Sequence, residues 1–458
     1  MNQTSSERGQ WSSKIGFIFA AAGSAIGLGN IWRFPYVTGI NGGAAFVFVY
    51  LICVLVIGLP YLFAELALGR SVQKNPVGAI SALRPKSPWI MVGGLGIITG
   101  IFILSYYSVI AGWTFGYIFK TVIPNQMSFG DFVSNPFIVI ALFGIFILLT
   151  VLVVYGGVQN GIERWSKILM PILFFLLIIL IIYANFLPGS SKGLSFYLNP
   201  DFSKITGKVI LAALGQAFFS LSLGMGLMVT YGSYISKEDN LISSGFYVAV
   251  ADTMIAIMAG LIIFPALFAM DKNPAEGPGL VFTVLPAIFD HMPAGRIFGV
   301  VFFILLSIAA LTSTISLLEV ATSYMVDEKR IARKMAVWIV GLLVFILGLP
   351  SALSQGAWPA LSKKFSLILQ YGDKQAAVIN QLDFLSLMDF IWGNFSLAVG
   401  AFLLSIFVGW VWGIKHAAAE LSQGNPGFMK WATSWGFLIR FVCPISIFII
   451  LLGLFQIF

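Results

Sequence analysis

The fold is decided by the stretch Gly23-Ser24-Ala25-Ile26-Gly27-Leu28-Gly29-Asn30-Ile31-Trp32-Arg33-Phe34-Pro35, in which glycines interrupt an otherwise apolar segment. Gly23, Gly27 and Gly29 lie within seven residues, and each lowers helix propensity by about 1 kcal/mol relative to alanine. Inside a bilayer, the backbone amides and carbonyls that such a break frees need partners. Free carbonyls bind cations and helix N-termini attract carboxylates, so the stretch predicts a buried site for an ion and a substrate.

The composition of the whole chain indicates a membrane protein with many spans. Of its 458 residues, 59% are hydrophobic and only 10% are charged, and the mean hydropathy is +0.95. This is more apolar than soluble proteins of similar length. A membrane-spanning helix needs about 20 apolar residues, and eleven segments qualify: 15–37, 44–68, 90–119, 137–155, 165–185, 209–235, 241–269, 297–325, 335–350, 385–413 and 432–457.

The N-terminus is predicted to be cytoplasmic. The polar residues 1–9 precede the first apolar run, which lacks the pattern of a cleaved signal peptide and is interpreted as a retained helix. A cytoplasmic N-terminus places 15 Lys and Arg residues inside and 9 outside, in agreement with the positive-inside rule. We therefore expect a multi-pass protein of the inner (plasma) membrane. Its net charge of +8 is explained by topology and not by a nucleic-acid partner.

The sequence lacks the motifs that are typical of enzymes and metal sites. Cys53 and Cys443 lie in apolar spans, whereas His291 and His416 lie in loops, so neither a disulfide framework nor a metal centre is predicted. The chain has no phosphate-binding loop, no GxSxG elbow and no dinucleotide fingerprint. We therefore do not expect an enzyme.

A second interrupted span predicts an internal repeat. Residues 216–226, Gln-Ala-Phe-Phe-Ser-Leu-Ser-Leu-Gly-Met-Gly, break the sixth span, and spans one and six each open a set of five. Paired breaks at corresponding positions are typical of transporters with inverted repeats. The alternative is that the small residues only allow close helix packing. We predict an all-α integral membrane protein with eleven spans in a 5+5 inverted repeat: residues 1–187, residues 209–413, and an eleventh helix at 432–458.

Specific motifs along nearly the whole chain resemble the neurotransmitter:sodium symporter family. They are residues 23–35, Asn41-Gly42-Gly43, Gly58-Leu59-Pro60, Glu65 with Gly69-Arg70, Ser105-Tyr106-Tyr107, residues 216–226, Thr312-Ser313 and Met388-Asp389-Phe390. The eleven predicted spans and the Ser222–Gly226 pattern are most like the bacterial members that carry hydrophobic or aromatic amino acids.

The resemblance implies a sodium-coupled symporter of hydrophobic or aromatic L-amino acids that works by alternating access. Alternatives are a sodium-coupled carrier of another small amino acid or osmolyte, or an amino-acid sensor or channel that does not accumulate its ligand. The sequence leaves open the preferred amino acid, the sodium stoichiometry, proton counter-transport and the formation of a homodimer.

The resemblance also implies two sodium sites, which would be built from oxygen atoms because sodium is a hard cation. The first is formed by Ala25, Asn30, Ser220 and Asp252, and the substrate carboxylate completes it. The second is formed by backbone carbonyls of Gly23, Ile26 and Ala309 and by the hydroxyls of Thr312 and Ser313. These two hydroxyls could instead bond to carbonyls of their own helix.

The substrate is expected to lie between the two breaks. In monoamine carriers of the family an aspartate occupies the position of Gly27, so glycine here favours an amino acid, which brings its own carboxylate. Ile103, Met225 and Leu317 could also be ordinary core residues. The resemblance implies contacts with Ala25, Gly29, Ile103, Tyr107, Phe219, Ser220, Ser222, Met225, Ser313 and Leu317.

Several charged residues are given roles by the resemblance. Asp252 lies inside a span, where a carboxylate costs roughly 3 kcal/mol, and its fixed charge is expected to replace the chloride that animal members need. Arg33 and Asp389 correspond to an outer gate pair and Arg8 and Asp327 to an inner one, although exposed pairs contribute only about 0–1 kcal/mol. Family counterparts of Glu65 bond to the freed amides of the sixth span.

Overall fold

The protein was analysed as a computed structural model that describes residues 9–123, 127–272, 281–291, 293–371 and 374–455. Its elements up to the middle of the chain are α1 (Lys14–Ala25), η1 (Gly29–Arg33), α2 (Phe34–Ile40), α3 (Ala44–Cys53), η2 (Val54–Gly58), α4 (Leu59–Val72), α5 (Pro76–Leu83), α6 (Ile90–Val122), α7 (Phe129–Ser134), α8 (Pro136–Tyr155), η3 (Val158–Glu163), α9 (Arg164–Asn185), α10 (Ser190–Leu198), η4 (Phe202–Lys204), α11 (Gly207–Ser220) and α12 (Leu227–Gly232).

The remaining elements are again mainly helical. They are α13 (Leu241–Ala269), α14 (Val284–His291), α15 (Gly295–Asp327), α16 (Arg333–Leu353), β1 (Phe365–Tyr371), β2 (Lys374–Leu382), α17 (Phe384–Met388), η6 (Asp389–Ser396), α18 (Leu397–Ile406), η7 (Phe407–Gly413), α19 (Ile414–Ser422), η8 (Pro426–Lys430), α20 (Ala432–Phe437), η9 (Leu438–Val442) and α21 (Cys443–Leu454).

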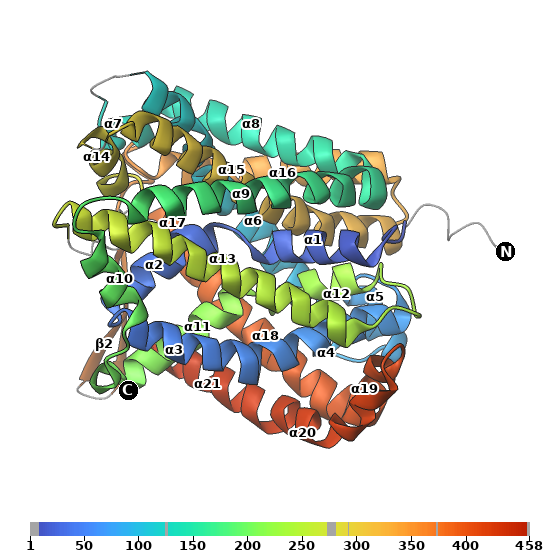
Figure 1. Ribbon diagram of the computed structural model, residues 1–458. Helices are drawn as coiled ribbons and strands as arrows, with labels where there is room; N and C mark the ends of the chain where they lie inside the picture. The colour runs from blue at the N-terminus through green and yellow to red at the C-terminus, as the bar shows by residue number, and fades with distance from the viewer. Residues whose placement is uncertain (1–8, 124–126, 273–280, 292, 372–373, 456–458) are drawn as a thin grey trace.

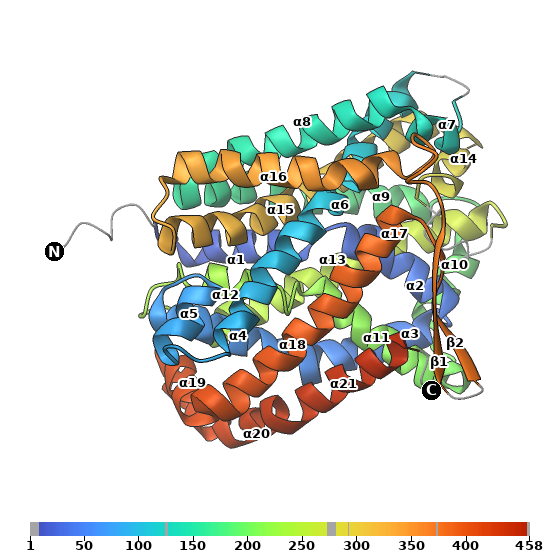
Figure 2. The same cartoon turned by 180° about the vertical axis from the view of Figure 1, so that it is seen from behind.

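The long helices run side by side and confirm the predicted all-helical membrane fold (Figures 1 and 2). In the described chain, nine uninterrupted helical stretches are long and apolar enough to cross a membrane, and a bent pair adds a tenth. The nine are Ala44–Val72, Ile90–Val122, Pro136–Tyr155, Val158–Asn185, Leu241–Ala269, Gly295–Asp327, Arg333–Leu353, Phe384–Ser422 and Ala432–Leu454.

The first span is broken where the glycines predicted it. α1 ends at Ala25, Ile26 takes an extended conformation with ψ of 107°, and helix resumes at Gly29. The two halves, Lys14–Ala25 and Gly29–Ile40, meet at an angle of 50°. The bend directs backbone groups of the first span sideways into the protein interior.

The sixth span is also interrupted, and its break is longer. α11 ends at Ser220 and α12 begins at Leu227, and neither helix alone is long enough to span a bilayer. Gly224 and Gly226 have φ of +84° and +72°, in the left-handed region where side chains other than glycine are strained. A Cβ on Gly224 would also lie 2.7 Å from the backbone oxygen of Leu397. Glycine is therefore required there for both conformation and space.

Packing separates a central group of helices from a peripheral one. α15 packs against α1, α6, α8 and α9, and most of its residues are buried, whereas few residues of α20 and α21 are. Large apolar side chains are exposed on the outside, including Phe137 (85%) and Phe175 (63%). Such exposure is expected where hydrocarbon and not water surrounds the protein.

A β-hairpin lies between the helical stretches Arg333–Leu353 and Phe384–Ser422. β1 and β2 pair in an antiparallel way between residues 351 and 384, with Tyr371 opposite Lys374 and Leu369 opposite Ala376. The spans were predicted from long apolar runs, and hydropathy gives no signal for a hairpin in this connection.

The inverted relation of the two predicted repeats and the orientation of the termini remain predictions. α1 begins and α21 ends on opposite sides of the molecule (Figure 1).

Candidate functional site

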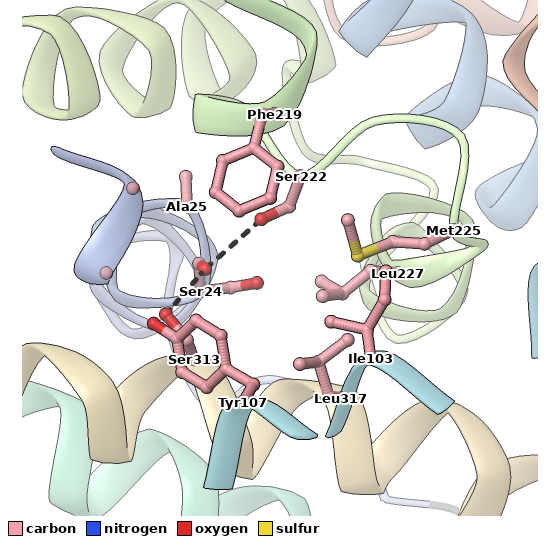
Figure 3. Close-up of a pocket in the computed structure, with 12 residues that line it drawn as sticks. Ser24, Ala25, Ile103, Tyr107, Phe219, Ser222, Met225, Leu227, Ser313 and Leu317 are labelled. Atoms are coloured by element: carbon pink, nitrogen blue, oxygen red, sulfur yellow. Dashed lines mark hydrogen bonds between the residues drawn. The ribbon is translucent and has the colours of Figure 1, made fainter. Parts of the chain in front are cut away.

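The two breaks face each other across a cavity (Figure 3). Its wall comes from the end of α1, from α6, from the α11–α12 break and from α15. Nine of the ten residues predicted to contact substrate line it; the tenth, Ser220, lies behind this wall. The lining residues are Ser24, Ala25, Gly27, Gly29, Ile103, Tyr107, Phe219, Ser222, Met225, Leu227, Ser313 and Leu317.

The cavity wall at the first break is polar and closely packed. The backbone N–H of Leu28 donates to the Tyr107 hydroxyl over 2.8 Å, and the N–H of Gly27 donates to Oδ1 of Asn30 over 3.2 Å. A Cβ on Gly27 would lie 2.6 Å from the Tyr107 oxygen, and one on Gly29 would lie 2.9 Å from the Phe219 ring. A larger residue at either position would therefore fill the space beside Tyr107 and Phe219.

Asn30, Ser220 and Asp252 form an acidic cluster next to this wall, and all three are fully buried. The amide nitrogen of Asn30 lies 2.7 Å from Asp252 Oδ1, 3.0 Å from the Asp252 backbone oxygen and 3.0 Å from Ser220 Oγ. The Ser220 hydroxyl donates to Asp252 Oδ2 over 2.7 Å. Three oxygens thus surround an amide that has two N–H groups. No Lys or Arg of the described chain forms an ion pair with Asp252. The acidic cluster therefore combines several oxygen atoms with a carboxylate that has no basic partner, and such a group can bind a cation.

Thr312 and Ser313 form a neutral cluster with the carbonyls of Ile26 and Ala309. The Thr312 hydroxyl lies 3.5 Å from the Ile26 oxygen and 3.0 Å from the Ala309 oxygen. For the Ser313 hydroxyl the two distances are 3.4 and 3.3 Å. Gly23 lies beside them, since a Cβ there would be 3.3 Å from Thr312 Cβ. The five residues predicted for the second sodium site are therefore neighbours, and both hydroxyls also bond within their own helix.

Two side chains hold the second break in place. Glu65, fully buried on α4, accepts a 2.8 Å hydrogen bond from the backbone N–H of Gly224, which confirms the predicted contact with a freed amide. Gln216 on α11 donates from Nε2 to the backbone oxygen of Gly29 over 2.9 Å. The first contact fixes the α11–α12 break, and the second joins it to the first span.

On the side of the molecule opposite to the start of α1, the predicted gate pair is bridged and not in direct contact. Arg33 donates to Asn394 Oδ1 over 3.3 Å, and Asn394 donates to Asp389 Oδ2 over 3.2 Å. The Arg33 guanidinium also lies 4.3 Å from the centre of the Phe219 ring. Arg33 and Asp389 line a second cavity together with Tyr107 and Phe219. Because Tyr107 and Phe219 line both cavities, they form the layer between them.

The amino-terminal side is closed by aromatic packing. Arg8, predicted to pair with Asp327, lies outside the described residues; Asp327 accepts hydrogen bonds from the backbone N–H and side-chain amide of Asn75 over 3.0 and 3.1 Å. Trp11 packs edge-on against Tyr231 with ring centres 5.2 Å apart, and its Nε1 donates to the backbone carbonyl oxygen of Tyr231.

Several residues of these sites are not among those predicted from the sequence. Ser24 and Leu227 carry no signal beyond their position next to the breaks. The buried ion pair of Glu319 with Arg333, at 2.5 Å, could have been found, because an acid inside an apolar span is a functional candidate by default. Asn394 could not, since a lone asparagine five residues after Asp389 has many possible partners.

Comparisons with known proteins find a matching family, similar sequences and a similar solved structure. The profile of the Sodium:neurotransmitter symporter family matches residues 8–135 and 128–382. YhdH of Bacillus subtilis, an uncharacterised sodium-dependent transporter, is 40% identical over 456 residues and is covered to 97%, as is this chain. An uncharacterised sodium-dependent transporter of Haemophilus influenzae is 34% identical over 99% of both chains. The crystal structure of MhsT in complex with L-phenylalanine superposes with a TM-score of 0.85 at 43% identity, over 98% of this chain and all of MhsT.

Proposed function

Because the chain belongs to the Sodium:neurotransmitter symporter family, and is a sodium-dependent transporter and not an enzyme, we propose that it takes up hydrophobic and aromatic L-amino acids by sodium-coupled symport. The observation that carries this proposal is the division of the central cavity into a polar and an apolar part. A phenylalanine is bound in the similar structure of MhsT, which supports an amino acid of this class.

The two parts of the cavity match the two parts of such a substrate. The substrate carboxylate would lie near the Tyr107 hydroxyl and the backbone of Gly29, and the ammonium near the Ala25 carbonyl and the Ser222 hydroxyl. The apolar side chain would face Ile103, Phe219, Met225, Leu227 and Leu317, which all line the cavity. Met225 is unbranched and polarisable and adapts to rings and branched chains alike, so we expect several substrates and not one.

Sodium would occupy the acidic and neutral clusters. In the acidic cluster, Asn30, Ser220 and Asp252 would share the ion with the Ala25 carbonyl and the substrate carboxylate. A ligand shared in this way couples the two binding events, because each raises the affinity for the other by the same factor. In the neutral cluster, Thr312, Ser313 and the carbonyls of Gly23, Ile26 and Ala309 would hold a second ion.

Transport would proceed by alternating access, with the central cavity opening to one side at a time. The layer of Tyr107 and Phe219, with Arg33, Asn394 and Asp389 above it, would be the gate on the side opposite to the N-terminus. Trp11, Tyr231 and the Asp327 region would be the gate on the amino-terminal side, which the positive-inside rule places in the cytoplasm. Cysteine accessibility from either side of the membrane would test this orientation.

The fixed charge of Asp252 would make transport independent of chloride. A sodium ion that binds next to a permanent carboxylate needs no added anion to balance it, and the described chain offers Asp252 no basic partner.

Uptake by purified protein in proteoliposomes tests the proposal. Labelled leucine, tyrosine and tryptophan are offered with sodium or potassium outside, and with chloride or gluconate as the anion. We expect concentrative uptake that needs sodium but not chloride. Sodium-dependent uptake of only small polar amino acids or osmolytes would show that the proposed substrate class is wrong and that sodium coupling is right. Binding without accumulation would indicate a sensor or channel.

A further inference from the structure

The hydroxyl of Ser24 is a polar atom of the central cavity that has no hydrogen-bond partner. Ser24 is the penultimate residue of α1, is 1% exposed and lines the cavity. Within the described residues its Oγ is buried and bonds to no other group. Figure 3 shows this hydroxyl pointing into the cavity toward Leu227. The other hydroxyls of the cavity wall, on Tyr107, Ser222 and Ser313, all have partners.

Most buried hydroxyls on the described helices bond back to a carbonyl of the preceding turn, as Thr230 does to Gly226, Ser316 to Ser313 and Thr322 to Leu318. Ser108, Thr253 and Ser351 share the lack of a partner with Ser24, but none of them lines the central cavity. Ser24 lies in the last turn of a regular helix, where the same bond to a carbonyl three or four residues earlier is available. Its hydroxyl faces the cavity instead, and a buried hydroxyl without a partner is destabilising.

Two hydrogen bonds hold the backbone of Ser24 in place beside the cavity. Its carbonyl oxygen accepts hydrogen bonds from the hydroxyls of Ser222, over 3.3 Å, and Ser313, over 3.2 Å, which are the dashed lines in Figure 3. These contacts come from opposite walls, the α11–α12 break and α15. The hydroxyl itself points toward Leu227 (Figure 3), and no other unpartnered side-chain hydroxyl of the described chain lines this cavity.

We propose that the Ser24 hydroxyl is the hydrogen-bond partner of a polar ring atom of the substrate, the indole N–H of tryptophan or the phenol O–H of tyrosine. This inference rests on the proposed function and gives aromatic amino acids with one polar ring atom a preference over the other members of its substrate class. A site built to bond such an atom rejects the analogue that lacks it, because its own polar group is then left unpaired. Phenylalanine and leucine would enter the same cavity but leave Ser24 unsatisfied.

Binding to the purified, sodium-loaded protein tests this with two matched pairs of ligands. Tryptophan is compared with 3-benzothienylalanine, in which sulfur replaces the indole N–H, and tyrosine with phenylalanine. In the wild type we expect at least one polar member to bind roughly 3- to 10-fold more tightly than its partner, as one hydrogen bond supplies. In Ser24→Ala that ratio should fall to about one, and in Ser24→Cys, whose sulfur is a weak acceptor, it should take an intermediate value.

Ser108 provides the matched control. Its hydroxyl on α6 is also buried and unpartnered but lies on no wall of the described cavities, so Ser108→Ala should keep the wild-type ratios. Ratios that are equal in the wild type and Ser24→Ala would overturn the inference and leave the proposed function intact. Failure of all four ligands to bind in a sodium-dependent way would instead remove the proposed function, and the inference with it.

Discussion

The acidic and neutral clusters lie beside the same broken helix, but only one of them carries a charge. In the neutral cluster, Thr312 and Ser313 bond to carbonyls of their own helix as well as to the first span. Its polar groups are therefore satisfied without an ion. In the acidic cluster, Asp252 is fully buried and has only the neutral donors Asn30 and Ser220.

Oxygen atoms at similar distances can therefore depend on a cation to different degrees. A buried carboxylate loses its hydration and must be balanced by a positive charge or by hydrogen bonds. Hydroxyls and carbonyls carry no such requirement. We therefore expect changes in the acidic cluster to alter which ions transport needs, and changes in the neutral cluster to alter only how tightly sodium binds.

The largest effect is expected for Asp252→Asn. Hydrogen bonds to charged groups contribute roughly 1.5–3 kcal/mol, so uptake without chloride should fall about 10- to 100-fold, and added chloride should restore part of it. Uptake in proteoliposomes at fixed sodium, with chloride replaced stepwise by gluconate, measures this. Asp252→Glu, which keeps the charge, serves as the control. Normal uptake by the asparagine variant that ignores chloride would contradict our account of Asp252.

A smaller effect is expected for Thr312→Val, which keeps the shape of the side chain and removes its hydroxyl. Loss of one neutral oxygen ligand, worth about 1 kcal/mol, should raise the sodium concentration for half-maximal uptake about fivefold without creating a chloride requirement. A sodium dependence equal to that of the wild type would show that this hydroxyl serves only its own helix.

Glu65→Gln tests whether the removal of any buried acid creates a chloride requirement, or only the removal of the acid in the acidic cluster. Glu65 is equally buried but contacts the Gly224 amide of the second break. Glutamine retains an acceptor for this amide, so we expect a decrease in Tm on the order of 2 °C and no chloride requirement. If chloride dependence emerged in this variant, burial of a negative charge at any place would suffice, and the comparison of the two clusters would lose its basis.

The smallest effect is expected for Tyr50→Phe. The Tyr50 hydroxyl donates to Ser220 Oγ over 3.3 Å, a long and therefore weak bond that supports the acidic cluster from outside. Its loss should weaken apparent sodium affinity about twofold. Tyr61→Phe removes another buried hydroxyl, which bonds to the Ala401 carbonyl, and should leave sodium affinity at the wild-type value. Equal effects of both variants would mean that Tyr50 acts through general packing.

Much of the cavity could be predicted because the motifs at both breaks have a clear physical meaning. Gly27, Gly224 and Gly226 mark places where helix cannot continue, and Asn30, Ser222 and Asp252 are polar residues inside apolar spans. The gate could be predicted only in part: Arg33 and Asp389 are neighbours, but the amide of Asn394 lies between them. Which side chain occupies such a position depends on how η1 and η6 pack, and no local pattern encodes that.

The membrane class, the positions of the two broken helices and the resemblance to a transporter family all follow from the order of the amino acids. Hydropathy, helix propensity and motif spacing are properties of short windows, so they can be read without knowledge of the fold. Only the tertiary structure decided that Asn30 and Asp252, 222 residues apart, share hydrogen bonds, and that the Ser24 hydroxyl faces the cavity without a partner. Contacts between distant segments depend on the packing of whole helices, and the orientation of a single hydroxyl depends on every neighbour that could bond to it.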